Sequence, residues 1–119
     1  MGTALSTARD PEEHFVPVAD QADLDRLFIE SAEQPVVLFK HDFACHISAS
    51  AYRELAAVPG EVLLIDVGRQ QGLADEVASR TGIKHESPQV IVLRNGRVVY
   101  AASHRGIIGE EVAHATCDA

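Results

Sequence analysis

The stretch Val36-Val37-Leu38-Phe39-Lys40-His41-Asp42-Phe43-Ala44-Cys45-His46-Ile47-Ser48 decides the fold. It opens with an apolar run of the kind found in strands that are covered on both faces. A short polar loop follows and places Cys45 at the start of a predicted helix. The free N–H groups and the positive dipole end at a helix N-terminus both favour a thiolate, which is the nucleophilic form of cysteine. The stretch therefore predicts a reactive cysteine at the carboxyl end of a strand.

Ser48 stands where a dithiol oxidoreductase carries its second active-site cysteine. The pattern is C-x-x-S, so no local disulfide can form and a thiol trapped on Cys45 must leave by another route. The alternative interpretation of Cys45 is a buried and inert thiol, which is the commoner fate of a free cysteine. The polar loop before Cys45 and the serine after it favour a one-cysteine redox site.

Helical and strand patterns alternate along the rest of the chain. Asp20 is a candidate N-cap, and Pro59-Gly60 ends the helix that follows Cys45. Asn95-Gly96 is a strong signal for a two-residue hairpin turn. The predicted order is helix, strand, helix, strand, helix, hairpin and helix. The apolar faces of the four helices are marked, in order, by Leu24, Leu27 and Phe28; by Ile47, Ala51, Leu55 and Val58; by Leu73, Val77 and Ala78, with Gly82 at the end; and by Ile107, Ile108, Val112 and Ala115. The two single strands are expected at 36–39 and 62–67, and the two hairpin strands at 90–93 and 98–100.

This order predicts an α/β fold. The two strand–helix–strand units imply parallel neighbours, and the hairpin adds an antiparallel edge strand. The expected architecture is a thioredoxin-like three-layer sandwich, with a mixed sheet that has parallel strands and a C-terminal antiparallel hairpin. Residues 1–18 are predicted to be a loose N-terminal lead-in, and 19–119 the thioredoxin-like domain. Cys45 falls at the carboxyl end of a parallel strand, where such sheets carry their chemistry.

Composition excludes several classes of function. The 119-residue chain has a formal net charge of −8, which argues against nonspecific nucleic-acid binding and against an anionic membrane surface. No apolar run approaches the length of about 18 residues that spans a membrane, and the first residues lack the pattern of a signal peptide. The two cysteines are far apart in sequence and form no disulfide framework. We therefore expect a reduced, cytoplasmic protein.

Two motifs together resemble the monothiol bacilliredoxins of the C type. The first is Phe39-Lys40-His41 with Cys45 and Ile47-Ser48-Ala49, and the second is Gly82-Ile83-Lys84-His85-Glu86-Ser87-Pro88-Gln89. The resemblance runs from about residue 20 to about residue 110. Members usually carry proline directly after the cysteine, where this chain has His46.

The resemblance implies a monothiol thiol-disulfide oxidoreductase that removes bacillithiol from protein mixed disulfides through Cys45. It implies no cofactor beyond bacillithiol, or a similar low-molecular-weight thiol, as cosubstrate. The expected partners are S-thiolated client proteins and the small thiol, with no nucleic acid and no membrane, and the chain is expected to be a monomer or a weak dimer.

Cys45, Ser48 and His46 are the predicted catalytic residues. Ser48 is a candidate hydrogen-bond partner for the sulfur, although it could be only a polar residue near the helix cap. A protonated His46 would stabilise a thiolate, but a cation at a helix N-terminus opposes that effect. Lys40 and His41 are candidate substrate-binding residues that offer positive charge to the thiolate and to an anionic thiol, or are merely solvated loop residues.

Ser87 and Pro88 complete the predicted substrate-binding set. Resemblance to thioredoxin-like proteins implies a cis bond between them, opposite the active cysteine, with the Ser87 backbone free to pair with an extended client. The alternative is an ordinary proline at the start of a strand. His85 and Glu86 are expected to be loop surface. Cys117 is expected to be a tail thiol, with a role as a resolving thiol for Cys45 left open.

Two other classes of function stay open at this stage. One is an iron–sulfur or metal carrier of the monothiol-glutaredoxin type, or a mononuclear site built from His41, Cys45 and His46. The other is a noncatalytic binding module with the thioredoxin fold, in which Cys45 is unreactive.

Overall fold

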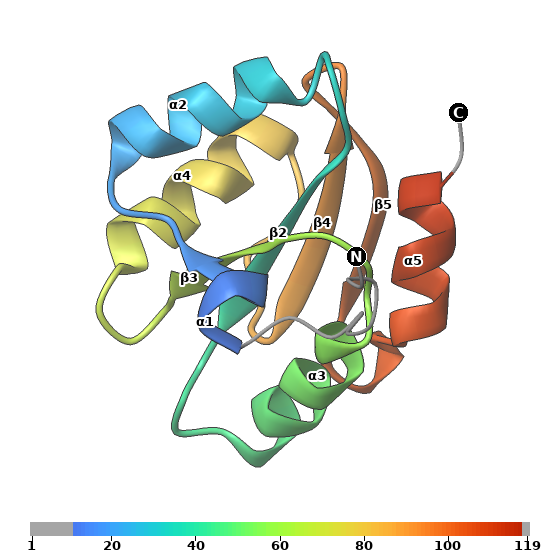
Figure 1. The fold of residues 1–119 in the computed structure, drawn as a ribbon. Helices are drawn as coiled ribbons and strands as arrows, with labels where there is room; N and C mark the ends of the chain where they lie inside the picture. Colours follow the sequence, from blue (N-terminus) through green and yellow to red (C-terminus); the bar gives the residue numbers. More distant parts are fainter. Residues whose placement is uncertain (1–10, 118–119) are drawn as a thin grey trace.

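A computed structural model describes residues 11–117 and shows a mixed five-stranded sheet between two layers of helices (Figure 1). The strand order is β1-β3-β2-β4-β5. The strands are β1 (Phe15–Pro17), β2 (Val36–His41), β3 (Val62–Asp66), β4 (Gln89–Arg94) and β5 (Arg97–Ser103). The helices are α1 (Pro11–His14), α2 (Gln21–Glu30), α3 (His46–Ala56), α4 (Gln71–Thr81), the 3₁₀ turn η2 (His104–Gly106) and α5 (Gly109–Cys117).

Local chemistry sets the ends of several elements where the sequence predicts them. The Asp20 side chain caps α2 by accepting a hydrogen bond from the backbone N–H of Asp23 at 2.9 Å. Gly82 ends α4 with a φ of 75°, a left-handed conformation that glycine adopts without steric cost. Asn95 and Gly96 both have positive φ, 57° and 73°, as a two-residue turn between β4 and β5 requires.

The central strand β2 runs parallel to β3 and antiparallel to β4. The predicted parallel pairing across α3 is therefore confirmed. The prediction of parallel neighbours is wrong for the second strand–helix–strand unit, because β4 enters the sheet beside β2 in the opposite direction. Gln89, the first residue of β4, pairs with Lys40 near the end of β2. The connection 82–88 thus delivers β4 to the carboxyl end of β2.

The domain also extends further towards the N-terminus than the predicted boundary at residue 18. Phe15–Pro17 forms β1, a parallel edge strand on β3, and Phe15 and Val18 are buried. A three-residue strand with a proline gives little periodic signal, although an edge is where a sheet accepts proline. Residues 1–10 of the predicted lead-in lie outside the described part of the chain.

Side chains that alternate along the strands build a separate core on each face of the sheet. Figure 1 shows α2 and α4 on one face and α3 and α5 on the other. The α3/α5 core includes Val37, Phe39, Leu55 and Val112. The α2/α4 core includes Leu24, Leu38 and Val77. In the described range 11–117, no helix is both long and apolar enough to cross a membrane.

Candidate active site

Cys45 occupies the N-cap position of α3, where the loop that leaves β2 turns into the helix. Its backbone is extended, with φ −112° and ψ 130°. The Cys45 carbonyl accepts from the Ala49 N–H at 3.1 Å, and the Cys45 N–H donates to the Asp42 carbonyl at 3.0 Å. The side chain makes no capping hydrogen bond and is only partly buried. The backbone is thus held at both polar groups, while the thiol remains free for reaction.

Ser48 joins the end of β2 to the first turn of α3. The residue is fully buried, and its Oγ lies 2.6 Å from Nδ1 of His41 and accepts from the Asp42 N–H at 2.9 Å. Among the residues that the structure describes, these are the partners of the hydroxyl, and the sulfur of Cys45 is not one of them. The structure therefore supports neither of the two interpretations of Ser48, as a partner of the sulfur or as a mere polar residue near the helix cap. Instead, Ser48 holds in place the loop that carries the cysteine.

The His41–Ser48 contact determines where the imidazole carries its proton. Burial lowers the pKa of His41, against an opposing effect of Asp42 and Asp66, so the ring is neutral at pH 7. The Ser48 hydroxyl is buried and needs an acceptor for its own hydrogen, and Nδ1 is the acceptor within reach. Ser48 therefore donates to Nδ1, and the proton of His41 sits on Nε2.

Removing the Ser48 hydroxyl should destabilise the fold. Ser48→Ala leaves the Asp42 N–H and Nδ1 of His41 without their partner, and we expect a loss of about 2 kcal/mol of unfolding free energy. Ser50→Ala is the matched control, because Ser50 is exposed on the same helix. Its stability should change by no more than about 0.5 kcal/mol. Urea unfolding of both variants measures the difference, and equal stabilities would mean that the buried contact contributes nothing.

Lys40 and His41 lie on β2 itself, with side chains 1% and 4% exposed, rather than in a solvated loop. Alternation along the strand sends the two side chains to opposite faces of the sheet. His41 packs with Phe39 and Tyr52 on the α3 face. The Lys40 Nζ lies 3.1 Å from Nδ1 of His85. The predicted contact of Lys40 with the thiolate is therefore replaced by a contact that fastens the 82–88 connection to β2.

Burial lowers the pKa of Lys40 to about 8, against an opposing effect of Asp75. The folded pKa lies below the unfolded one, so between about pH 8 and pH 10.5 the unfolded chain binds more protons than the folded chain. The free energy of unfolding therefore rises with pH through this window. The charged ammonium destabilises the fold most below pH 8.

Lys40→Met should therefore stabilise the protein at pH 7, by about 1–3 kcal/mol, since an apolar side chain of similar length replaces a buried charge. The advantage should shrink as the pH rises from 8 to 10.5 and the wild-type lysine loses its proton. Thermal unfolding across this pH range measures the difference in stability between the variant and the wild type, with Lys84→Met as an exposed control. A stability difference that stays constant with pH would show that Lys40 titrates normally.

Ser87 and Pro88 lie next to the strand that leads to Cys45. The peptide bond between them is cis, Pro88 is buried, and its carbonyl accepts from the His104 N–H at 2.9 Å. Gln89 pairs with Lys40, so the register brings the preceding Ser87 and Pro88 alongside the end of β2. The two predicted motifs, far apart in sequence, thus meet at one end of the sheet.

The remaining predicted residues are placed as follows. His46 is the exposed first residue of α3. His85 is only partly buried, and burial together with Lys40 lowers its pKa. A hydrogen bond from Ser103 lowers the pKa of the Glu86 carboxyl. Within 11–117, no group of three or more His, Cys, Asp or Glu side chains could hold a metal ion, so His41, Cys45 and His46 do not form such a set.

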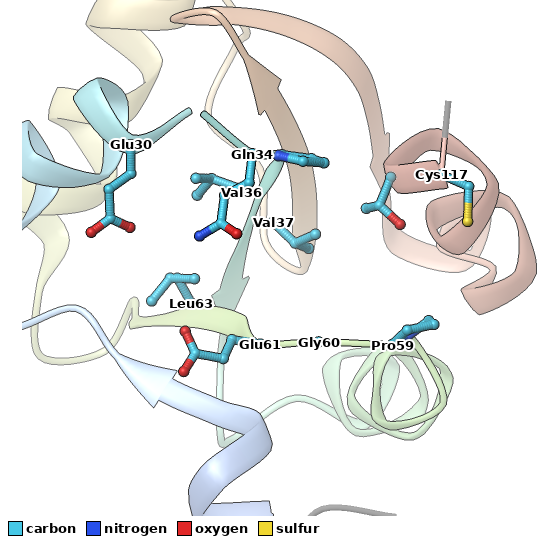
Figure 2. A pocket seen from close by; sticks show the side chains of 11 residues that line it. Glu30, Gln34, Val36, Val37, Pro59, Gly60, Glu61, Leu63 and Cys117 are labelled. Carbon is cyan, nitrogen blue, oxygen red and sulfur yellow. The ribbon is translucent and has the colours of Figure 1, made fainter. Parts of the chain in front are cut away.

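Cys117 lies at the opposite end of the sheet from Cys45. It is exposed near the end of α5, and with Pro59, Val36 and Val37 it lines a cavity of about 560 Å³ (Figure 2). Val36 begins β2, whereas Cys45 lies in the loop beyond His41, the last residue of that strand. A strand of six residues is roughly 16 Å long. In the folded chain, Cys117 is therefore not placed to resolve a disulfide on Cys45.

The sequence prediction missed a second cavity, of about 290 Å³, beside the first turns of α3. It is lined by His41, Phe43, Ala49, Tyr52 and Arg53. A signal for it was present, because positions four, seven and eight after Cys45 lie on one face of a helix. Phe43 is 66% exposed although its ring packs edge-on against His41 at 4.2 Å. Phe43 thus presents an apolar ring to solvent at the edge of this cavity, two residues before Cys45.

Comparison with known proteins gives a family match and a set of similar structures. The model of the family described as "Monothiol bacilliredoxin BrxC" matches residues 16–112. A solved structure described as "A putative oxidoreductase with a thioredoxin fold" is 25% identical, with a TM-score of 0.80, and covers 88% of this chain and 96% of that chain.

Thioredoxins are similar at lower identity. The N21Q mutant thioredoxin from Halobacterium salinarum NRC-1 is 17% identical, with a TM-score of 0.63, and covers 92% of this chain and 93% of that one. Thioredoxin F from spinach chloroplast, in its long form, is also 17% identical, with a TM-score of 0.66, and covers 89% and 88%. These two similarities show the fold alone, and they confirm the predicted thioredoxin-like architecture.

Proposed function

The chain belongs to the monothiol bacilliredoxin family of thioredoxin-fold thiol oxidoreductases, and from this premise we propose that it removes bacillithiol from protein mixed disulfides in the cytoplasm, with Cys45 as the nucleophile. The observation that carries the proposal is the setting of Cys45. Its thiol is free and partly exposed at a helix N-terminus, and the chain's other cysteine lies at the far end of the sheet.

The reaction consists of two thiol–disulfide exchanges. In the first, the Cys45 thiolate attacks the bacillithiol sulfur of the mixed disulfide. The bond between the two sulfurs breaks, and the client leaves as its thiolate while bacillithiol becomes joined to Cys45. In the second exchange, the thiolate of another bacillithiol molecule attacks that sulfur, releases Cys45 and leaves as the oxidised bacillithiol dimer. The two electrons that reduce the client come from the small thiol, so bacillithiol serves as cosubstrate and no other cofactor enters.

The neighbouring residues have supporting roles in this proposal. Ser48 and His41 hold the cysteine loop through their buried contact. The Ser87 backbone, alongside the end of β2, offers its N–H and C=O to an extended client segment. His46 is exposed beside Cys45 and can contact the anionic thiol. Lys40 faces the other side of the sheet and acts only by fastening the 82–88 connection.

The proposal is tested with a small model client that carries a single cysteine, joined either to bacillithiol or to glutathione. The wild-type protein, in catalytic amount with the matching free thiol, should release the client thiol far faster than the free thiol alone. We expect the bacillithiol form to react faster than the glutathione form. Release at the rate of the free thiol alone, for both forms, would contradict the proposed function.

A further inference from the structure

The cavity of about 290 Å³ next to α3 lies along the helix from the reactive cysteine. Ala49 follows Cys45 by one helical turn, and its N–H donates a hydrogen bond to the Cys45 carbonyl. Tyr52 and Arg53 follow by about two turns, on the same side of α3. Phe43, from the loop just before Cys45, forms another wall. A molecule joined to Cys45 through its sulfur can therefore extend over this cavity.

The cavity presents hydrogen-bond donors that the protein itself does not use. Arg53 is exposed and gives one hydrogen bond, from Nη2 to the Ser50 hydroxyl at 3.2 Å. It forms no ion pair with any residue in the described range, so most of its five N–H groups are free. The Tyr52 hydroxyl also has no bonded partner among the described residues.

His41 supplies a further donor. Its proton sits on Nε2 because Ser48 donates to Nδ1. In the described part of the chain, the only buried side-chain nitrogen or oxygen without a partner is Oε1 of Gln89. Nε2 of His41 also lacks a hydrogen-bond partner, yet it is not one of these fully buried atoms, so it must touch solvent. His41 lines this cavity, and the cavity is therefore where its ring meets solvent. The cavity thus combines a neutral N–H donor, a phenol and a guanidinium with aromatic walls.

We infer that this cavity binds the carboxylate-bearing end of the small thiol, with Arg53 as the partner of the carboxylate and the rings of Phe43 and Tyr52 against the body of the molecule. The inference rests on the proposed function and identifies which residues select the thiol. A protein with a net charge of −8 repels an anionic substrate at long range. A guanidinium in the cavity offsets this repulsion locally and binds carboxylate through paired N–H groups.

The spacing also sets the size of thiol that fits. Arg53 lies eight residues beyond Cys45, which corresponds to about 12 Å along the helix axis. The long arginine side chain leans back towards the helix N-terminus and shortens this span. A carboxylate several bonds away from the sulfur, as in bacillithiol or glutathione, reaches the guanidinium. The carboxylate of free cysteine is too close to its own sulfur to do so.

The test compares one model client bearing three different thiols: bacillithiol and glutathione, which carry carboxylates, and mercaptoethanol, which carries no charge. Arg53→Gln should lower kcat/KM for the bacillithiol form about tenfold, mainly through KM. With the mercaptoethanol form of the client, Arg53→Gln should react at the same rate as the wild type. The matched control is Arg97→Gln, which removes the same charge from an exposed position beside the β4–β5 turn and should leave all three rates unchanged. The glutathione arm shows whether the cavity accepts either carboxylate-bearing thiol.

The outcomes separate this inference from the proposed function. Equal rates for Arg53→Gln and Arg97→Gln with every thiol, while the wild type remains active, would overturn the inference alone. A loss in Arg53→Gln that is the same for mercaptoethanol and bacillithiol would also overturn it, because it would show a structural defect. A wild type that releases none of the three thiols would overturn the proposed function and this cavity's role together.

Discussion

Cys45→Ala is expected to abolish release of bacillithiol from a modified client, with a fall in rate of at least about 10³-fold, to the rate of the free thiol alone. The reason is that the first exchange requires a thiolate attached to the protein, and no other side chain near the end of β2 can supply one. The measurement is the initial rate of client release at fixed protein concentration.

Cys117→Ala is the matched control for this result. The substitution removes the chain's other thiol from the opposite end of the sheet, where it is exposed near Pro59. The rate should stay within about twofold of the wild type. If Cys117→Ala were as inactive as Cys45→Ala, the reaction would need both cysteines, and the one-cysteine mechanism would be wrong.

Gly109→Ala should be the most destabilising of the substitutions considered. Gly109 begins α5, and its N–H donates to Oε1 of Glu54 on α3 at 2.7 Å. A Cβ at this position would overlap the backbone carbonyl oxygen of Glu54 and lie 3.2 Å from its carbon. Backbone atoms within a helix cannot move aside as the end of a flexible side chain can, so α3 and α5 must separate. The packing of the core on this face of the sheet, to which Leu55 and Val112 both belong, would loosen.

We expect Gly109→Ala to lower the free energy of unfolding by about 3 kcal/mol or more. Gly72→Ala serves as the control, because a Cβ there meets nothing within 4 Å and the residue lies inside α4. Alanine favours a helix, so this variant should gain about 0.5 kcal/mol. Chemical denaturation measures both variants. A Gly109→Ala protein as stable as the wild type would show that α3 and α5 do not pack this closely.

Much of the fold could be predicted because its signals are local. The apolar runs of β2 and β3, the Asp20 cap and the Asn95-Gly96 turn each act within a few residues of chain. The direction of β4 could not be predicted in this way. It depends on the path by which the 82–88 connection brings the start of β4 to the carboxyl end of β2, and strand–helix–strand spacing alone does not encode that path.

The position of Cys45 could likewise be predicted, since a strand, a polar loop and a helix start are adjacent in sequence. The partners of the neighbouring polar residues could not. Lys40 and His41 belong to residue types that are seldom fully buried, and the sequence gives no sign that β2 extends through both. The contact of Lys40 with His85 spans 45 positions, so it appears only once β4 is in place. Ser48 forms its hydrogen bond with His41 because the end of β2 and the first turn of α3 lie side by side in the folded chain.

The most direct test of the one-cysteine mechanism is intact-protein mass spectrometry of the wild type after reaction with oxidised bacillithiol. The account predicts a gain of one bacillithiol per chain, retained in Cys117→Ala, absent in Cys45→Ala and reversed by free bacillithiol. A loss of two mass units without an adduct would mean that Cys45 and Cys117 pair with each other. That result would contradict both the monothiol mechanism and the placement of the two cysteines at opposite ends of the sheet.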